Sequence, residues 1–167
     1  MLIIDARAPE GALPTEALCL SFETRCRSRL RTHLASGEAC ELLLPRGAVM
    51  RHGDHLLGRD GRVIRVVAAD EDLLEAHTAD PLLLARAAYH LGNRHVALSI
   101  APGRLRFAHD HVLGDMVRGL GLEVVHVHAP FEPESGAYGA HGGHAHPHGH
   151  SADGEGRGPR IHDHFGH

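Results

Sequence analysis

The chain has 167 residues, enough for one ordinary domain or two small ones. Its formal net charge of -4 gives no basic footprint for nucleic acid or an anionic membrane surface, and 4% aromatic residues without Trp argue against a stacking platform for single-stranded nucleic acid. We therefore expect no nucleic-acid partner and no membrane partner.

The amino terminus shows no secretory signal pattern, and no run of about 20 apolar residues occurs that could span a membrane. A soluble, cytoplasmic protein is expected. The three cysteines, Cys19, Cys26 and Cys40, are odd in number and lack the C-x-x-C spacing of a thiolate metal site or redox motif. We interpret them as small hydrophobic residues of the core.

Residues 1–70 carry short, strand-like patterns without a convincing helical period. Leu18, Leu20 and Phe22 alternate, and the turn 59–62, with its Asp-Gly step, lies between apolar runs, which is a strong hairpin signal. A small all-β N-terminal domain is predicted over residues 1–70. Alternating arginines in this region predict one solvated strand face rather than a binding patch; they are Arg25, Arg27, Arg29 and Arg31.

The pattern changes after residue 70. Residues 73–78 predict a strand, and Asp80 followed by Pro81 has the N-cap and first-turn residues with which helices commonly begin. A broad apolar face continues through this helix, and Gly92 suits a left-handed residue at its end.

The next elements complete a second domain. Residues 96–100 and 105–108 predict two strands joined by a Pro-Gly turn, residues 110–120 predict a helix that Gly121 ends, and residues 122–128 predict a last strand. The order β-α-β-β-α-β predicts a ferredoxin-like domain over residues 71–138, a four-stranded antiparallel sheet with two helices on one face. The fold class of the whole chain is therefore α+β.

Residues 139–167 are rich in Gly, His and Pro with few apolar side chains, so we expect a flexible tail. Eight of the chain's 18 histidines lie there, at His141, His144, His146, His148, His150, His162, His164 and His167. Many imidazoles on one flexible segment give a high local ligand concentration. We take His144, His146, His148 and His150 as candidate metal ligands. An affinity tag is the alternative, but these histidines are interspersed rather than contiguous.

Histidines also cluster around the folded elements. His90 lies on the last predicted turn of the first helix, and His95 lies just past it, at the start of a strand. Either residue fits a structural role near a helix end, and His95 also fits a metal ligand.

His109 and His111 are spaced i, i+2 at a strand end, where alternate side chains point to one face and could chelate a metal. The alternative is a capping segment with Asp110 as N-cap, and the spacing alone does not decide between them. His126 and His128 repeat the spacing on the last strand, and their role stays open.

Three segments carry a family resemblance: Tyr89–His95, with the sequence YHLGNRH, His109–Leu113 and Phe131–Tyr138. With them the chain resembles the UreE family, the urease accessory nickel chaperones, most specifically over residues 72–138. The resemblance implies that His95, which matches the histidine ending Gly-Asn-Arg-His, binds one metal ion together with its counterpart across the two-fold axis of a homodimer. It also implies a secondary site at His109 and His111 and a partner-binding role for the N-terminal domain.

The resemblance further implies a metallochaperone that delivers Ni(II) to apo-urease through the UreG GTPase and a complex of the remaining accessory proteins. Nickel enters only in this way, because imidazole also suits Zn(II) and Cu(II), and Cu(II) binds more tightly than Ni(II) in the divalent order. Which tail histidine joins the His95 site, and whether dimers pair into metal-induced tetramers, are left open.

Motifs of nucleophilic, phosphate-binding or zinc-hydrolase sites are missing from the sequence, so a carrier is favoured over an enzyme. Two alternatives remain. One is a His-rich buffer or storage protein for Ni, Zn or Cu, in which the tail does the binding. The other is a metalloenzyme with an open histidine site. Because imidazole binds a metal only when neutral, metal affinity is expected to fall as the pH drops through about 6.5.

Overall fold

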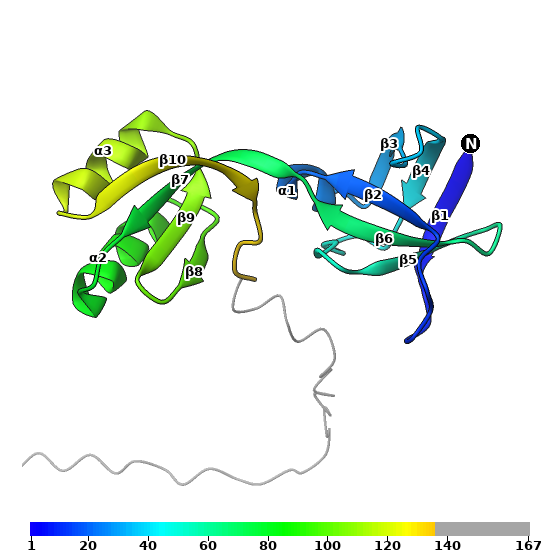
Figure 1. Ribbon diagram of the computed structural model, residues 1–167, viewed down its shortest axis with the longest axis horizontal. Coiled ribbons are helices and arrows are strands. Elements are labelled where there is room, and N and C mark those ends of the chain that lie inside the picture. Colours follow the sequence, from blue (N-terminus) through cyan, green and yellow to red (C-terminus); the bar gives the residue numbers. More distant parts are fainter. Residues whose placement is uncertain (136–167) are drawn as a thin grey trace, which may run out of the picture. The chain divides into compact units, whose positions relative to one another are not determined.

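The computed structural model describes residues 1–135, and these residues contain two β-sheets (Figure 1). The predicted tail, residues 139–167, and the predicted boundary at residue 138 lie outside this range. None of the helices among the described residues is long and apolar enough to cross a membrane.

The first sheet has six strands in the order β2-β6-β5-β1-β4-β3 within the described residues. It is mixed, because β1 pairs with β4 and β2 with β6 in parallel while the other neighbours are antiparallel. Alternate side chains such as Ile64 and Val66 are fully buried and form its core. The strands are β1 (Leu2–Arg7), β2 (Glu16–Leu20), β3 (Arg29–His33), β4 (Ala39–Leu43), β5 (His55–Gly58) and β6 (Val63–Ala68).

The hairpin predicted around residues 59–62 is present between β5 and β6, with Leu57 opposite Val63 and Gly61 at a φ of 87°. The prediction of strands alone over residues 1–70 is wrong at one point, because α1 (Phe22–Arg25) forms a single helical turn. Ser21 caps this turn by accepting a hydrogen bond from the Thr24 amide. One turn is too short to show a helical period in the sequence.

The prediction of one solvated arginine face is also wrong. Arg27, Arg29 and Arg31 are exposed, but Arg25 lies on α1 with no exposed surface. The Arg25 side chain donates to the carbonyl oxygens of Leu20 and Met50 at 3.3 and 3.2 Å. These acceptors compensate part of the loss of water around a buried guanidinium.

The interpretation of the cysteines holds for one of the three. Cys40 is buried in the core of the first sheet, whereas Cys19 and Cys26 are exposed. Cys19 lies on β2 between two buried leucines, so the strand's alternation turns its side chain to the other face.

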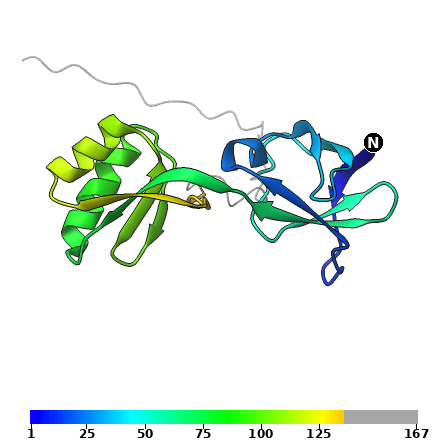
Figure 2. The same cartoon turned by 45° about the horizontal axis from the view of Figure 1, so that its top comes forward.

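The second sheet has the strand order β10-β7-β9-β8, and each neighbouring pair is antiparallel. Figure 2 shows α2 and α3 side by side on one face of this sheet. Ala87 and Leu91 of α2 and Val117 of α3 pack there against Leu74 and Phe107 of the strands. In chain order the elements are β7 (Asp70–His77), α2 (Pro81–Gly92), β8 (Ser99–Ala101), β9 (Arg104–Ala108), α3 (His111–Gly119) and β10 (Glu123–Pro130).

Most of the predicted helix and turn signals in this region are confirmed. Asp80 accepts hydrogen bonds from the second and third amides of α2, and Asp110 does the same for α3. Gly121 follows α3 at a φ of 104°, and Gly103 closes the turn between β8 and β9 at a φ of 70°. The strand predicted over residues 96–100 is shorter and begins only at Ser99, because Val96 takes part in the end of α2.

Candidate metal centre

The end of α2 gives His95 an unusual backbone conformation. His95 has a φ of 56°, and it is the only residue other than glycine with a positive φ in residues 1–135. Its amide donates to the Gly92 carbonyl at 2.9 Å, and the next amide, Val96, donates to the Leu91 carbonyl at 3.2 Å. These two bonds form a Schellman motif in which His95 holds the position usually taken by glycine.

This geometry corrects the prediction for Gly92, which is the last helical residue and has no positive φ. The left-handed residue comes three positions later. Leu91 is fully buried and Val96 packs against the same core, so the apolar contact that often accompanies a Schellman motif is present. The histidine is therefore fixed at its backbone by both hydrogen bonds and packing.

His95 itself is exposed, so its imidazole is accessible on an ordered turn. Arg94 reaches back to donate to the His90 carbonyl at 2.9 Å and closes the helix end further. The His90 ring lies edge-on to Tyr89, with ring centroids 5.4 Å apart. His90 thus has an aromatic contact on the helix, whereas the described contacts of His95 are made by its backbone.

A second group of side chains meets where β7 and β10 pair next to the start of α3. Asp72 Oδ1 accepts a hydrogen bond from His126 Nε2, and Asp72 Oδ2 lies 3.4 Å from His109 Nδ1. The rings of His109 and His126 are 5.0 Å apart between centroids and tilted by 56°. Cross-strand pairing explains this meeting, because β10 places His128 opposite Asp72 and His126 two residues away.

The imidazoles around Asp72 alter its acidity. The hydrogen bond from His126 lowers the pKa of the Asp72 carboxyl, and the nearby His126, His109 and His128 rings lower it further. The charged carboxylate is favoured, and this is the form that can bind a cation. The His109 and His126 imidazoles are donors of a kind that divalent transition metals accept, but with Asp72 they do not form a three-ligand metal site.

The structure brings His109 to His126, and it describes no contact between His109 and His111. His111 is the first residue of α3, and Asp110 accepts from the Val112 and Leu113 amides at 2.8 and 3.0 Å. Asp110 is therefore the N-cap of α3, as the capping alternative predicted. Asp72 was missed by sequence reasoning, and the register of β7 against β10 is the signal that would have found it.

Among residues 1–135, no group of three or more His, Cys, Asp or Glu side chains could hold a metal ion. His52 has a structural role, since its Nδ1 accepts from the Ala68 amide at 3.1 Å. The candidate ligands His144, His146, His148 and His150 lie outside the described residues.

Comparison with known proteins extends this picture over most of the chain. A family model described as the C-terminal domain of the UreE urease accessory protein matches residues 71–164, and the model of the N-terminal domain matches residues 3–69. The chain belongs to the UreE family. The resemblance inferred from three sequence segments is thereby confirmed, and it covers both sheets of this UreE chain.

Similar proteins from several organisms carry the name urease accessory protein UreE. The Citrobacter koseri protein is 48% identical over 152 residues, covering 90% of this chain and 99% of its own. The Nitrosospira multiformis protein is 47% identical and covers 95% and 89%, and the Alkalilimnicola ehrlichii protein is 52% identical and covers 83% and 85%. UreE proteins are accessory proteins rather than enzymes, in agreement with the sequence analysis.

Proposed function

We propose that this UreE-family protein is a metallochaperone that carries Ni(II) to apo-urease while the active site of urease is assembled. The observation that carries the proposal is His95, an exposed imidazole held by a Schellman motif at a position where glycine is usual. Left-handed residues other than glycine cluster at functional sites, where the surrounding structure holds them in place. The relatives share the name urease accessory protein, which supports urease assembly as the process in which the carrier acts.

The proposed carrier site joins two copies of His95 across the two-fold axis of a homodimer. An exposed histidine on a single chain provides one ligand, and a two-fold interface doubles it. Exposed apolar side chains on α2 and β8 support such an interface. Leu82 and Tyr89 lie two turns apart on α2 and are 60% and 65% exposed, and Ile100 on the edge strand β8 is 48% exposed.

Two imidazoles leave coordination positions of the metal open, which suits a carrier. In the proposed function His144, His146, His148 or His150 of the tail fill these positions during transport, and ligands of the acceptor protein replace them on transfer. Zn(II) and Cu(II) can bind the same imidazoles, so selection of Ni(II) depends on more than ligand type.

We propose His109 and His111 as auxiliary metal ligands that act together with histidines of the tail. Asp72 Oδ2 lies 3.4 Å from His109 Nδ1, and Asp72 also accepts a hydrogen bond from His126, so the carboxylate contacts both rings. Such a site gathers metal without enclosing it.

The remaining proposals concern assembly and partners. We infer a ferredoxin-like metal-binding and dimerisation domain over residues 71–138, a partner-binding domain over residues 1–70 and a His-rich tail over residues 139–167. The protein acts in the cytoplasm with the UreG GTPase and the apo-urease complex, and metal can pair dimers into tetramers. The β-α-β-β-α-β order and the antiparallel second sheet support the fold proposal.

Activation of apo-urease at limiting nickel tests the proposal. His95→Ala removes the carrier ligand and is expected to lower activation by about tenfold or more. His33→Ala is the matched control, because His33 is an exposed histidine at the end of β3. Equal activation by both variants would contradict the carrier role of His95.

The buffer or storage alternative makes the opposite prediction for the tail. If the tail alone binds metal, deletion of residues 141–167 abolishes both tight binding and urease activation. If the protein is a carrier, activation survives this deletion at least in part, because His95 remains.

A further inference from the structure

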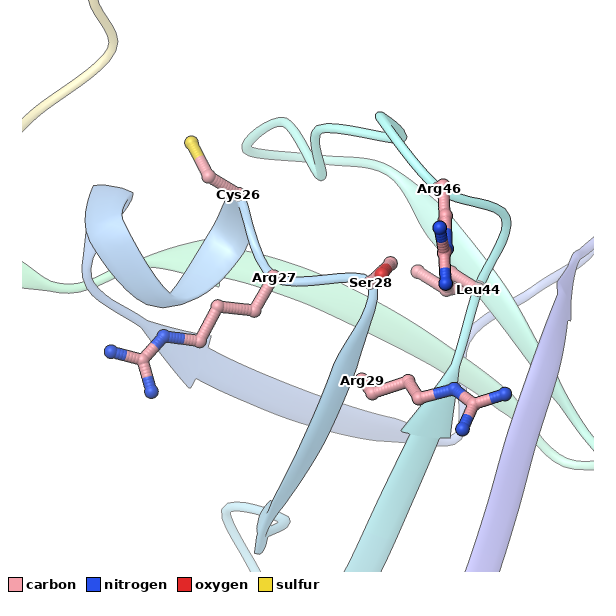
Figure 3. A pocket seen from close by; sticks show the side chains of 6 residues that line it. All are labelled: Cys26, Arg27, Ser28, Arg29, Leu44 and Arg46. Carbon is pink, nitrogen blue, oxygen red and sulfur yellow. The ribbon is translucent and has the colours of Figure 1, made fainter.

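A hollow of about 540 Å³ lies beside α1 at one end of the first sheet (Figure 3). Its walls come from the residues after α1, the start of β3, and the end of β4 with the turn that follows. In Figure 3 the Arg29 and Arg46 side chains extend on the Leu44 side, while Arg27 extends toward α1. The lining residues are Cys26, Arg27, Ser28, Arg29, Leu44 and Arg46.

The hollow carries more positive charge than its surroundings neutralise. Arg27 forms an ion pair with Glu23 one helical turn earlier. Arg29 and Arg46 are both exposed, and neither forms an ion pair with a carboxylate of residues 1–135. Although Cys26 is exposed, the loss of some water around its thiol raises the pKa of that thiol, so Cys26 adds no negative charge to the hollow. Two guanidinium groups are therefore left to bind an external anion.

Protection of a sheet edge explains only part of this charge. β3 is an edge strand, and charged side chains on edge strands discourage pairing with other chains. That accounts for Arg29 and for Arg31, which pairs with Glu41 across the sheet. It does not account for Arg46, which lies in the turn after β4 and faces the same hollow.

We propose that this hollow binds an acidic segment of a partner protein through Arg29 and Arg46. Guanidinium groups match carboxylates with paired hydrogen bonds, and Leu44, a core residue that is 8% exposed, borders them with a small apolar surface. The volume suits several side chains of a peptide, as in ligand pockets of about 300 to 1,000 Å³.

Inorganic phosphate is the less suitable anion. Sites built for phosphate use preorganised donors such as the amides of a helix N-terminus. Here the residues after α1 lie at the carboxyl end of that helix, and both unpaired guanidinium groups are exposed on flexible side chains. The inference rests on the partner-binding role proposed for residues 1–70. It does not depend on metal binding, because none of the lining residues is a candidate metal ligand.

The test uses the full chain and a fluorescein-labelled peptide of alternating Glu and Leu, with a Gln-Leu peptide as its neutral counterpart. Fluorescence anisotropy at neutral pH and low salt measures binding. Arg46→Gln should weaken binding of the acidic peptide, and Arg29→Gln with Arg46→Gln should weaken it by about tenfold, because charge-assisted hydrogen bonds are lost. The control is Arg65→Gln, an exposed arginine on β6 outside the hollow, and it should leave binding unchanged.

Several results would overturn the proposal: no binding of the acidic peptide, equal binding of the neutral peptide, or an equal loss in Arg65→Gln. Displacement of the peptide by millimolar-range inorganic phosphate, with phosphate binding lost in the double variant, would reassign the hollow to small anions. Circular dichroism melting checks that the variants fold. Nickel titration of the same variants should match the unmodified protein, so failure of this proposal is distinguishable from failure of the nickel proposal.

Discussion

His95 combines a left-handed backbone with an exposed imidazole. A residue with a Cβ in this conformation is destabilised by about 1 kcal/mol relative to a right-handed one, and glycine avoids this strain. The Schellman motif by itself would therefore favour glycine at this position. The presence of histidine instead is consistent with a demand for its side chain.

Substitution of His95 by glycine and by alanine separates the contribution of its imidazole to metal binding from the effect of its left-handed backbone on stability. Both His95→Gly and His95→Ala should lose the tight nickel site. His95→Gly should be more stable than His95→Ala by about 1 kcal/mol, because only glycine relieves the left-handed strain. Urea unfolding of the metal-free variants measures this difference. Equal stability, or greater stability of His95→Ala, would contradict the assignment of strain to this turn.

At the scale of elements, local signals located most of the second sheet and its helices. Asp80, Asp110 and Gly121 were found correctly because a cap or a left-handed stop depends on neighbouring residues. The end of α2 was misplaced at Gly92 because packing of Val96 against the core carries the turn three residues further. The position of a glycine in the sequence does not indicate where such packing ends a helix.

A pair of opposite charges connects the neighbouring strands β7 and β9 of the second sheet. Glu75 lies opposite Arg106 in the register, is 8% exposed, and accepts a hydrogen bond from Arg106 Nε at 2.8 Å. Burial acts to raise the pKa of the Glu75 carboxyl, but the hydrogen bond and charge of Arg106, with Arg104 and His77 nearby, lower it overall. The charged form is therefore favoured in the folded state.

Glu75→Gln should destabilise the protein by about 3 kcal/mol at neutral pH, because it leaves the Arg106 charge without its carboxylate. A lowered folded pKa gives stability that is present above the unfolded value of about 4.3 and is lost as the pH falls through the folded value. The difference between the two proteins should therefore shrink below about pH 4. Urea unfolding as a function of pH checks this, and a difference independent of pH would contradict it.

At the scale of the whole molecule, Arg25 links segments that lie far apart in the sequence. Besides the Leu20 and Met50 carbonyls, its guanidinium contacts the Glu132 carboxylate and the Phe131 carbonyl, 107 and 106 residues away. The Phe22 ring packs edge-on against Phe131 with centroids 5.7 Å apart. Residues just after β10 are thus held by residues of the N-terminal region.

Arg25→Met should destabilise the protein by about 3 kcal/mol or more, because it leaves buried acceptors unpaired and Glu132 without this partner. Arg27→Met is the matched control, since Arg27 is exposed and its ion pair with Glu23 should contribute less than about 1 kcal/mol. Chemical unfolding measures both. Equal effects of the two substitutions would show that the Arg25 contacts contribute little.

The contacts of Arg25 and Asp72 could not be predicted from the sequence, because their partners lie far away along the chain. Nothing near Arg25 in the sequence distinguishes it from the exposed Arg27, because its acceptors come from other parts of the chain. Asp72 meets His126 for a similar reason, through the register of two strands that begin 53 residues apart, at Asp70 and Glu123. The family resemblance predicted His95 and His109 as metal ligands, whereas the contacts around them required the fold.

Nickel titration by calorimetry, with mass by light scattering, of the protein lacking residues 141–167 and of its His95→Ala variant decides whether His95 forms the carrier site. The first protein should be a dimer that binds about one tight ion through two imidazoles, and its His95→Ala variant should lose that site. Loss of tight binding already on removal of the tail would contradict the carrier site and favour storage. A tight site that survives in His95→Ala would contradict the assignment of His95.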